Sequence, residues 1–160
     1  MINIFRIFHV LFASMTLGLM PVGIIMMGRM KKAQGTPAEM ATMGNMLALG
    51  KTMGMLGALG LLITGGALVG IESYKWFSFS DFPWLAWKQT AFTLILIVSL
   101  GLVMPASKKM GGLIAARMAS GEMTATDEIR ALGAKIGMFS IVMNLLGLTA
   151  MTLGVSKGIF

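Results

Sequence analysis

The stretch MINIFRIFHVLFASMTLGLMPVGIIMMGRMKK, residues 1–32, decides the fold class of this chain. Its apolar part, about residues 4–27, is longer than the ~20 residues that an α-helix needs to cross the hydrocarbon core of a bilayer. Three further helices of this kind are predicted at about 37–71, 83–106 and 126–154, in a chain of 160 residues that is 56% hydrophobic and 12% charged. We therefore expect an all-α fold, an integral membrane four-helix bundle that forms a single membrane domain over residues 1–160.

The basic residues indicate how the bundle lies in the membrane. The formal net charge is +7, and most Lys and Arg residues fall in or near the connection between the first two helices or that between the last two. Because cytoplasmic loops are enriched in Lys and Arg, this distribution predicts that both termini lie outside, in a multi-pass protein of the bacterial inner (cytoplasmic) membrane. Anionic lipid headgroups beside these loops account for the charge, so no nucleic-acid partner is expected. The residues concerned are Arg29, Lys31, Lys32, Lys51, Lys108, Lys109, Arg117, Arg130 and Lys135.

The chain resembles itself after a shift of 83 residues. Thirteen identities link positions 17–55 to their counterparts, among them Leu17-Gly18-Leu19 with Leu100-Gly101-Leu102. A chain of this composition would give ~3 identities by chance, from a sum of squared residue frequencies applied to a repeat search. We therefore predict a parallel 2+2 helix repeat over about 1–72 and 84–155, with shared Gly, Met and Leu bias as the alternative explanation. His9 falls on Phe92 under this shift, so only the first half carries the imidazole.

His9, the only histidine, lies inside the first apolar stretch. An ionisable side chain within a membrane helix is a functional-site hypothesis by default, because lipid offers it no hydrogen-bond partner. Three roles are open: packing against a neighbouring helix, proton handling near neutral pH, and axial ligation of a haem iron or other metal. Thr16 and Met20 follow His9 on the same helix face, in a groove that would accept either a flat macrocycle or another helix.

Aromatic residues gather between the second and third helices. Trp84 and Trp87 belong to this group, which contains every Trp of the chain. An interfacial aromatic belt is one interpretation, and a lip over a flat ligand such as a porphyrin or quinone is another. Lys88 follows in the first turns of the third helix, at about the depth of His9, where it would either snorkel towards the interface or take part in the site. The group consists of Tyr74, Trp76, Phe77, Phe79, Phe82, Trp84 and Trp87.

Short signals mark helix ends and bends near the basic loops. The run Thr36-Pro37-Ala38-Glu39 predicts a capping box, in which the Thr36 and Glu39 side chains each bind the backbone of the other residue. Pro21 and Pro105 fall inside the first and third helices, where each is expected to cause a kink.

Two short motifs resemble a group of small bacterial membrane proteins. The motifs are Phe5-Arg6-Ile7-Phe8-His9-Val10-Leu11 and Trp84-Leu85-Ala86-Trp87-Lys88. The group includes the haem-containing HemJ-type protoporphyrinogen oxidases and the CopD-like copper-resistance domains, and the chain is most similar to a sister family of unknown function. In the oxidases a first-helix histidine and a lysine entering a later helix are tied to haem, so the resemblance implies these roles for His9 and Lys88. One turn before the lysine, where the oxidases carry a basic residue, this chain has Trp84.

Two functions of different classes follow. In the first, the protein binds a b-type haem through His9 near the outer leaflet, with Lys88, Thr16, Met20, Trp84 and Trp87 as further candidate cofactor contacts, for electron transfer or porphyrin oxidation. In the second, it is a cofactor-free structural or assembly subunit of a larger respiratory or photosynthetic membrane complex. Either form is expected to be embedded in the lipid bilayer as a homo-oligomer or a subunit. The sequence leaves enzymatic activity open.

Overall fold

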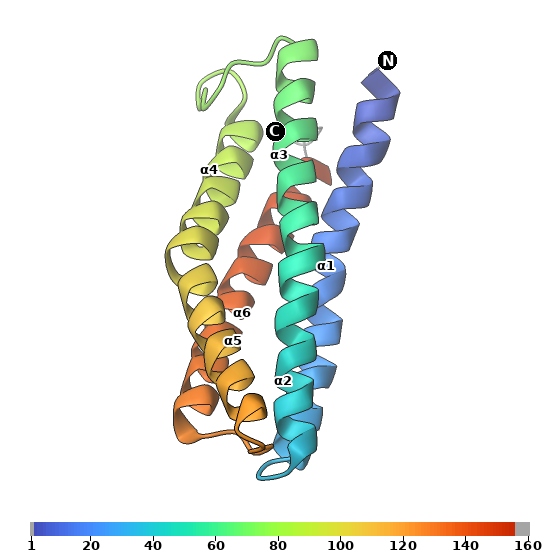
Figure 1. Cartoon of the computed structure of the whole chain (residues 1–160). Coiled ribbons are helices and arrows are strands. Elements are labelled where there is room, and N and C mark those ends of the chain that lie inside the picture. Colours follow the sequence, from blue (N-terminus) through green and yellow to red (C-terminus); the bar gives the residue numbers. More distant parts are fainter. Residues whose placement is uncertain (1, 156–160) are drawn as a thin grey trace.

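The computed structural model describes residues 2–155, and helices are the only regular elements within that range. Four long helical segments run alternately up and down the molecule (Figure 1). This confirms the predicted all-α four-helix bundle. All four segments are long and apolar enough to cross a bilayer, so the protein is a multi-pass integral membrane protein. Their parts are α1 (Ile2–Lys32); α2 (Pro37–Leu49), η1 (Gly50–Gly54) and α3 (Met55–Ile71); α4 (Pro83–Val98), η2 (Ser99–Val103) and α5 (Met104–Ala119); and α6 (Asp127–Val155).

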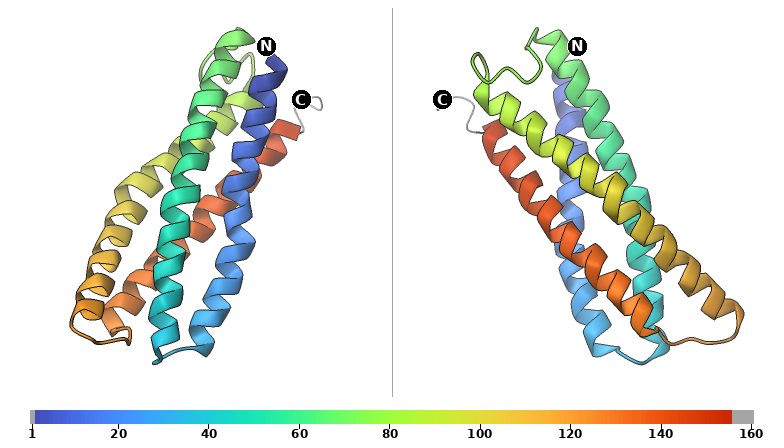
Figure 2. Two further views of the ribbon diagram at one scale, coloured as in Figure 1. Left: turned by 45° about the vertical axis from the view of Figure 1, so that its right-hand side comes forward. Right: turned by 90° about the vertical axis from the view of Figure 1, so that its left-hand side faces the viewer.

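The bundle consists of two helical hairpins. In the first, α1 packs along α2 and α3, and in the second, α6 packs along α4 and α5. The hairpins cross at an angle and meet where α1 contacts α6 and α2 contacts α5 (Figure 2). We call the end with the connections 33–36 and 120–126 the basic end, and the end with the loop 72–82 the aromatic end. The repeat and the orientation in the membrane stay predictions.

Two π-turns interrupt the long helices. The turn η2 ends just before Pro105, whose ring would collide with the carbonyl group four residues earlier in a regular helix. The extra residue of a π-turn relieves this collision, which explains its position. No proline lies near η1; there, the Thr52 hydroxyl donates a hydrogen bond to the Ala48 carbonyl, 2.8 Å away. Pro21, in contrast, lies within α1, which stays α-helical on both sides of it.

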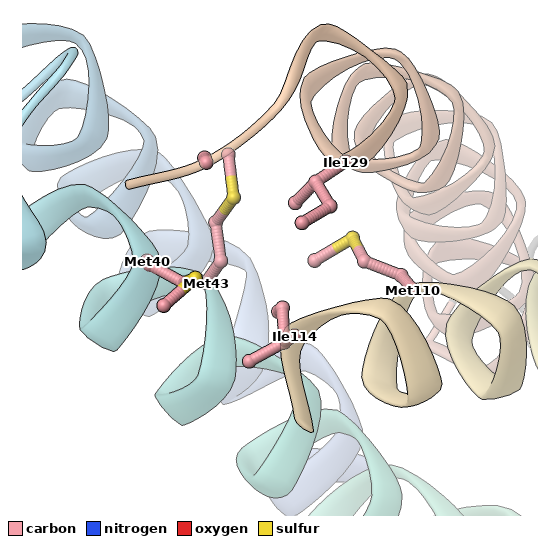
Figure 3. Packing of buried hydrophobic residues seen from close by; sticks show 6 residues of the cluster. Met40, Met43, Met110, Ile114 and Ile129 are labelled. Atoms are coloured by element: carbon pink, nitrogen blue, oxygen red, sulfur yellow. The ribbon is translucent and has the colours of Figure 1, made fainter. Parts of the chain in front are cut away.

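The largest cluster of buried side chains lies at the basic end. Its members come from α2, α5, the connection 120–126 and the start of α6 (Figure 3). Burial of apolar side chains is favourable where the alternative is water, and here it joins the two hairpins. The cluster consists of Met40, Met43, Met110, Ile114, Ala125 and Ile129.

Small residues make the contacts between α1 and α3. Gly57 lies under Thr16, and Gly60 lies under the ring of Phe12, so closely that a Cβ atom on either glycine would overlap its neighbour. Lipid removes the hydrophobic drive for helix association, and close backbone approach with van der Waals contact replaces it. The glycines therefore set how α1 lies on α3.

A buried ion pair reinforces the basic end. The Glu39 side chain is only 4% exposed, and its carboxylate accepts hydrogen bonds from Arg130 Nε at 2.8 Å and Arg130 NH2 at 2.9 Å. The same carboxylate accepts the backbone N–H of Gly35 at 2.8 Å. The predicted capping box is therefore wrong in detail: the Thr36 hydroxyl turns back to the Ala33 carbonyl, because Glu39 is held by Gly35 and by the second hairpin.

Polar and charged side chains indicate which part of the bundle lies in the hydrocarbon core of the bilayer, which we call the apolar slab. Twenty residues separate His9 from Arg29 on α1, a rise of about 30 Å, which equals the thickness of a bilayer core. On the second helical segment, Thr64 lies opposite His9 and therefore marks the same boundary. We infer that His9 lies at the boundary of the slab near the aromatic end. The cluster of buried side chains then lies beyond the other boundary, in contact with water.

Replacement of Gly60 by alanine is expected to destabilise the bundle by about 1–3 kcal/mol, because the new Cβ overlaps Phe12. Thermal unfolding in detergent measures this loss. Gly18→Ala is the matched control, since a Cβ on Gly18 meets no atom within 4 Å. A second change, Phe12→Ala, should restore part of the stability of Gly60→Ala. Equal melting temperatures of the two glycine variants would contradict the proposed contact.

Replacement of Arg130 by alanine is expected to lower the melting temperature by several degrees, because the Glu39 carboxylate then stays buried without its cation. Arg117→Ala is the control, since Arg117 pairs with the exposed Glu122. Glu39→Gln in the Arg130→Ala background should recover stability. If Arg130→Ala and Arg117→Ala have the same melting temperature, the buried pair does not fasten the hairpins.

Candidate functional site

His9 is held by the second helical segment of its own hairpin. The ring is half-buried on α1, and its Nδ1 atom lies 2.9 Å from the Thr64 hydroxyl on α3. Thr64 is 5% exposed, and its hydroxyl lies 2.6 Å from the Gly60 carbonyl one turn earlier. A polar side chain in a membrane helix needs such an internal partner.

This chain of hydrogen bonds fixes which ring nitrogen carries the proton. A threonine hydroxyl has one hydrogen, and here it is donated to the Gly60 carbonyl. The Thr64 oxygen must therefore accept from His9, so the proton of the neutral ring lies on Nδ1. No residue among 2–155 forms a hydrogen bond with Nε2. The Nε2 lone pair is the group that this arrangement leaves for chemistry.

Glycines make room for the side chains of His9 and Lys88 near the aromatic end. A Cβ on Gly65 would lie 3.3 Å from Cε1 of His9, and a Cβ on Gly154 would lie 3.0 Å from Nζ of Lys88. Lys88, on α4 of the second hairpin, is close enough for its charge to act on the His9 ring. The structure thus brings together His9 and Lys88, which the sequence placed at one depth.

Thr16 and Met20, the other predicted cofactor contacts on α1, lie further from the His9 ring along the helix. The Thr16 hydroxyl donates to the Phe12 carbonyl at 2.9 Å, and the side chain rests on Gly57. This face of α1 is therefore covered by α3 at the level of Thr16. Met20 is half-buried and lies about 16 Å from His9 along the helix axis.

The two tryptophans at the start of α4 have different surroundings. Trp84 is half-buried and meets Tyr74 edge-to-face, with ring centroids 5.8 Å apart. Trp87 is 57% exposed and meets Phe79 in the same manner at 5.3 Å. Both indoles line a shallow apolar groove with Leu153 of α6. Trp84 therefore belongs to the packed part of the aromatic loop, whereas Trp87 faces outwards.

An ion pair ties the loop to the helix that carries His9. Arg6 NH2 lies 2.7 Å from the Glu72 carboxylate at the end of α3. Glu72 also hydrogen-bonds Tyr74, which raises the pKa of the phenol above its usual value. The loop contains two non-glycine residues with positive φ, Ser73 and Phe77. The Phe77 N–H is held by the Gln89 side chain at 2.7 Å, so the loop is fastened at its start and at its middle.

Sequence analysis missed Thr64, the residue that orients His9. A threonine within an apolar run gives no sign that it contacts another helix, because threonine hydroxyls commonly donate to a carbonyl of their own helix, as Thr64 does. The available signal was the register of the first hairpin. A turn at 33–36 places residues whose numbers add to about 69 at one level, and His9 with Thr64, whose numbers add to 73, lies about one helical turn from that level.

His9 is the one imidazole of the chain that a cofactor could use. Among residues 2–155 no group of three His, Cys, Asp or Glu side chains converges, so these residue types form no multidentate metal site there. A haem iron requires only an axial donor such as imidazole from the protein. His9 Nε2 could serve as that donor, and the bond from Nδ1 to Thr64 would orient the ring.

Comparison with protein families, curated proteins and solved structures found no match to this chain. The resemblance to haem-binding and copper-resistance membrane proteins therefore stays a prediction, and the functional argument depends on the geometry of His9.

The ring of His9 is expected to carry its proton on Nδ1 at pH 8, where an unperturbed imidazole is neutral. Because His9 is the only histidine, ¹⁵N-histidine labelling gives a single pair of ring signals whose shifts report the tautomer. Thr64→Val should move the population towards the Nε2 tautomer, and Thr93→Val, an exposed threonine on α4, should not. A predominantly Nε2-protonated ring in the unmodified protein would contradict the assignment.

Proposed function

We propose that this integral membrane protein binds a b-type haem at its aromatic end, with His9 Nε2 as an axial ligand, and serves in electron transfer. The observation that carries the proposal is the hydrogen-bond chain from His9 Nδ1 through Thr64 to the Gly60 carbonyl, and the tautomer that we assign from it has no proton on Nε2. A histidine that served only in packing would not need its ring held from one side with the other nitrogen left unbound by residues 2–155.

The surroundings of His9 support the choice of a planar, charged ligand. Gly65 and Gly154 admit the His9 ring and the Lys88 ammonium group, and Lys88 provides a positive charge from the second hairpin. A haem carries propionate carboxylates, and an ammonium group at the membrane boundary is a suitable partner for one of them. Bound haem would supply one-electron chemistry at this boundary. The chain would hold the ring of His9, and Thr64 would keep the proton on Nδ1.

An optical spectrum of the full chain, purified in mild detergent from cells supplied with haem, tests the proposal. We expect a Soret band, and extraction by acidic acetone would identify non-covalent b-type haem. The band should be lost in His9→Ala and should persist in Ser14→Ala, which changes an exposed residue of the same helix. Thr64→Val should keep haem but bind it about 10–100-fold more weakly, as expected for a residue that orients a ligand.

A colourless protein would overturn the proposal. Co-purification of a partner at fixed stoichiometry would then favour the second candidate function, a structural or assembly subunit of a larger membrane complex. The observation that favours this candidate is the exposure of aromatic side chains around the loop 72–82, namely Trp76, Phe77, Phe79 and Trp87.

A further inference from the structure

The ion pairs at the basic end leave several cations without a counter-ion. Each carboxylate at this end is paired: Glu39 and Asp127 with Arg130, Glu122 with Arg117, and Glu128 with Lys109. Lys51 and Lys108 are exposed, and no residue among 2–155 forms an ion pair or hydrogen bond with either side chain. The basic end therefore offers positive charge that the protein itself does not neutralise.

Helix register places Lys51 and Lys108 on the same seam between the hairpins. Leu47 of α2 lies against Gly111 of α5, where a Cβ on the glycine would meet the leucine at 3.9 Å. Lys51 follows Leu47 by one turn, and Lys108 precedes Gly111 by almost one turn, on helices that run in opposite directions (Figure 2). Both lysines are thus displaced from this contact towards the aromatic end, one on each wall of the seam.

The seam continues as two apolar rows. Met55 lies one turn beyond Lys51 and is 51% exposed, and Met104 lies one turn beyond Lys108 and is 52% exposed. Leu59 and Leu100 extend the two rows by another turn, at 50% and 59% exposure. Helices α2 and α5 are in contact, whereas no contact of similar extent joins α3 and α4. The walls are therefore cationic where the helices meet and apolar where they separate.

The depth of Lys51 selects a lipid over a soluble anion. Thirteen residues separate Lys51 from Thr64, a rise of about 20 Å, whereas the apolar slab is about 30 Å thick. The Lys51 backbone therefore lies inside the slab, in the π-turn η1, and its long side chain reaches towards the headgroup layer. Lipid phosphate is the anion of that layer, and basic sites between membrane helices bind such headgroups.

We propose that one anionic phospholipid binds in this seam, with its headgroup between Lys51 and Lys108 and an acyl chain along Met55 and Met104. The lipid phosphate is shared by the two ammonium groups and offsets one of their two positive charges, and the acyl chain covers the apolar rows of the separating helices. The site lies at the opposite end from His9 and does not rest on haem binding.

Native mass spectrometry of the full chain in zwitterionic detergent tests the proposal, with added phosphatidylglycerol or phosphatidylcholine. We expect one tightly bound phosphatidylglycerol and no comparable binding of phosphatidylcholine. Lys51→Gln with Lys108→Gln should weaken binding by about 30-fold, about fivefold for each lysine near an anionic headgroup. The matched control, Lys31→Gln with Lys32→Gln, removes the same charge from the end of α1 and should bind as the unmodified protein does.

Three results would overturn the proposal. Equal binding of the two lipids would exclude an anionic site, and equal losses in the two double variants would show a diffuse charge effect. Displacement of the lipid by inorganic phosphate at equal concentration would show a soluble-anion site instead. Circular dichroism of each variant without lipid checks its folding, and the single variants Lys51→Gln and Lys108→Gln carry the test if the double variant does not fold.

Discussion

The hydrophobic effect acts on only one part of this bundle, and the rest of the structure follows from that constraint. Where water surrounds the helices, at the basic end, Met40, Met110 and Ile129 form a dense cluster of buried side chains. Inside the apolar slab, burial of a leucine gains nothing over lipid, so leucines such as Leu56 and Leu59 face outwards and glycines such as Gly57 and Gly60 form the contacts between α1 and α3. The hairpins are therefore joined by buried side chains at the basic end, whereas α1 and α6 meet elsewhere at small residues such as Gly147.

The same constraint makes the few polar groups of the slab informative. Lipid cannot solvate a hydroxyl or an imidazole, so each must find a protein partner or bind a ligand. Thr64 resolves this within its own helix by donating to Gly60, and His9 resolves half of it by donating to Thr64. The other ring nitrogen, Nε2, has no hydrogen-bond partner among residues 2–155, and for this reason we place the candidate site at His9. Lys51 presents the corresponding problem for a charge, since a cation without a carboxylate in reach requires an anion from outside the protein.

The fold could be predicted from the sequence because membrane spans are marked by composition alone, as the stretch 1–32 shows. The depth of His9 and Lys88 followed from their positions near helix ends. Thr64 and the pair of Glu39 with Arg130 could not be predicted, since they depend on register between segments 55 and 91 residues apart. The motif at Thr36 misled for a related reason: local sequence assigns Glu39 to its own helix end, whereas Arg130 from α6 offers a stronger, charged partner.

The His9–Thr64 hydrogen bond and the Glu39–Arg130 ion pair each occur in only one half of the predicted repeat. A shift of 83 residues takes His9 to Phe92 and Thr64 to Gly147, so the second hairpin has neither the imidazole nor its hydroxyl partner. The shift also takes Glu39 to Glu122, which pairs with Arg117 at the surface. Arg130, the partner of Glu39, corresponds under the same shift to Leu47, which packs at the seam on Gly111. If the halves arose by duplication, each special group was kept or gained in one copy only. In the predicted repeat the second hairpin packs with a phenylalanine at the position of His9, so this level of a hairpin does not require an imidazole for packing; this is why we propose a ligand for His9.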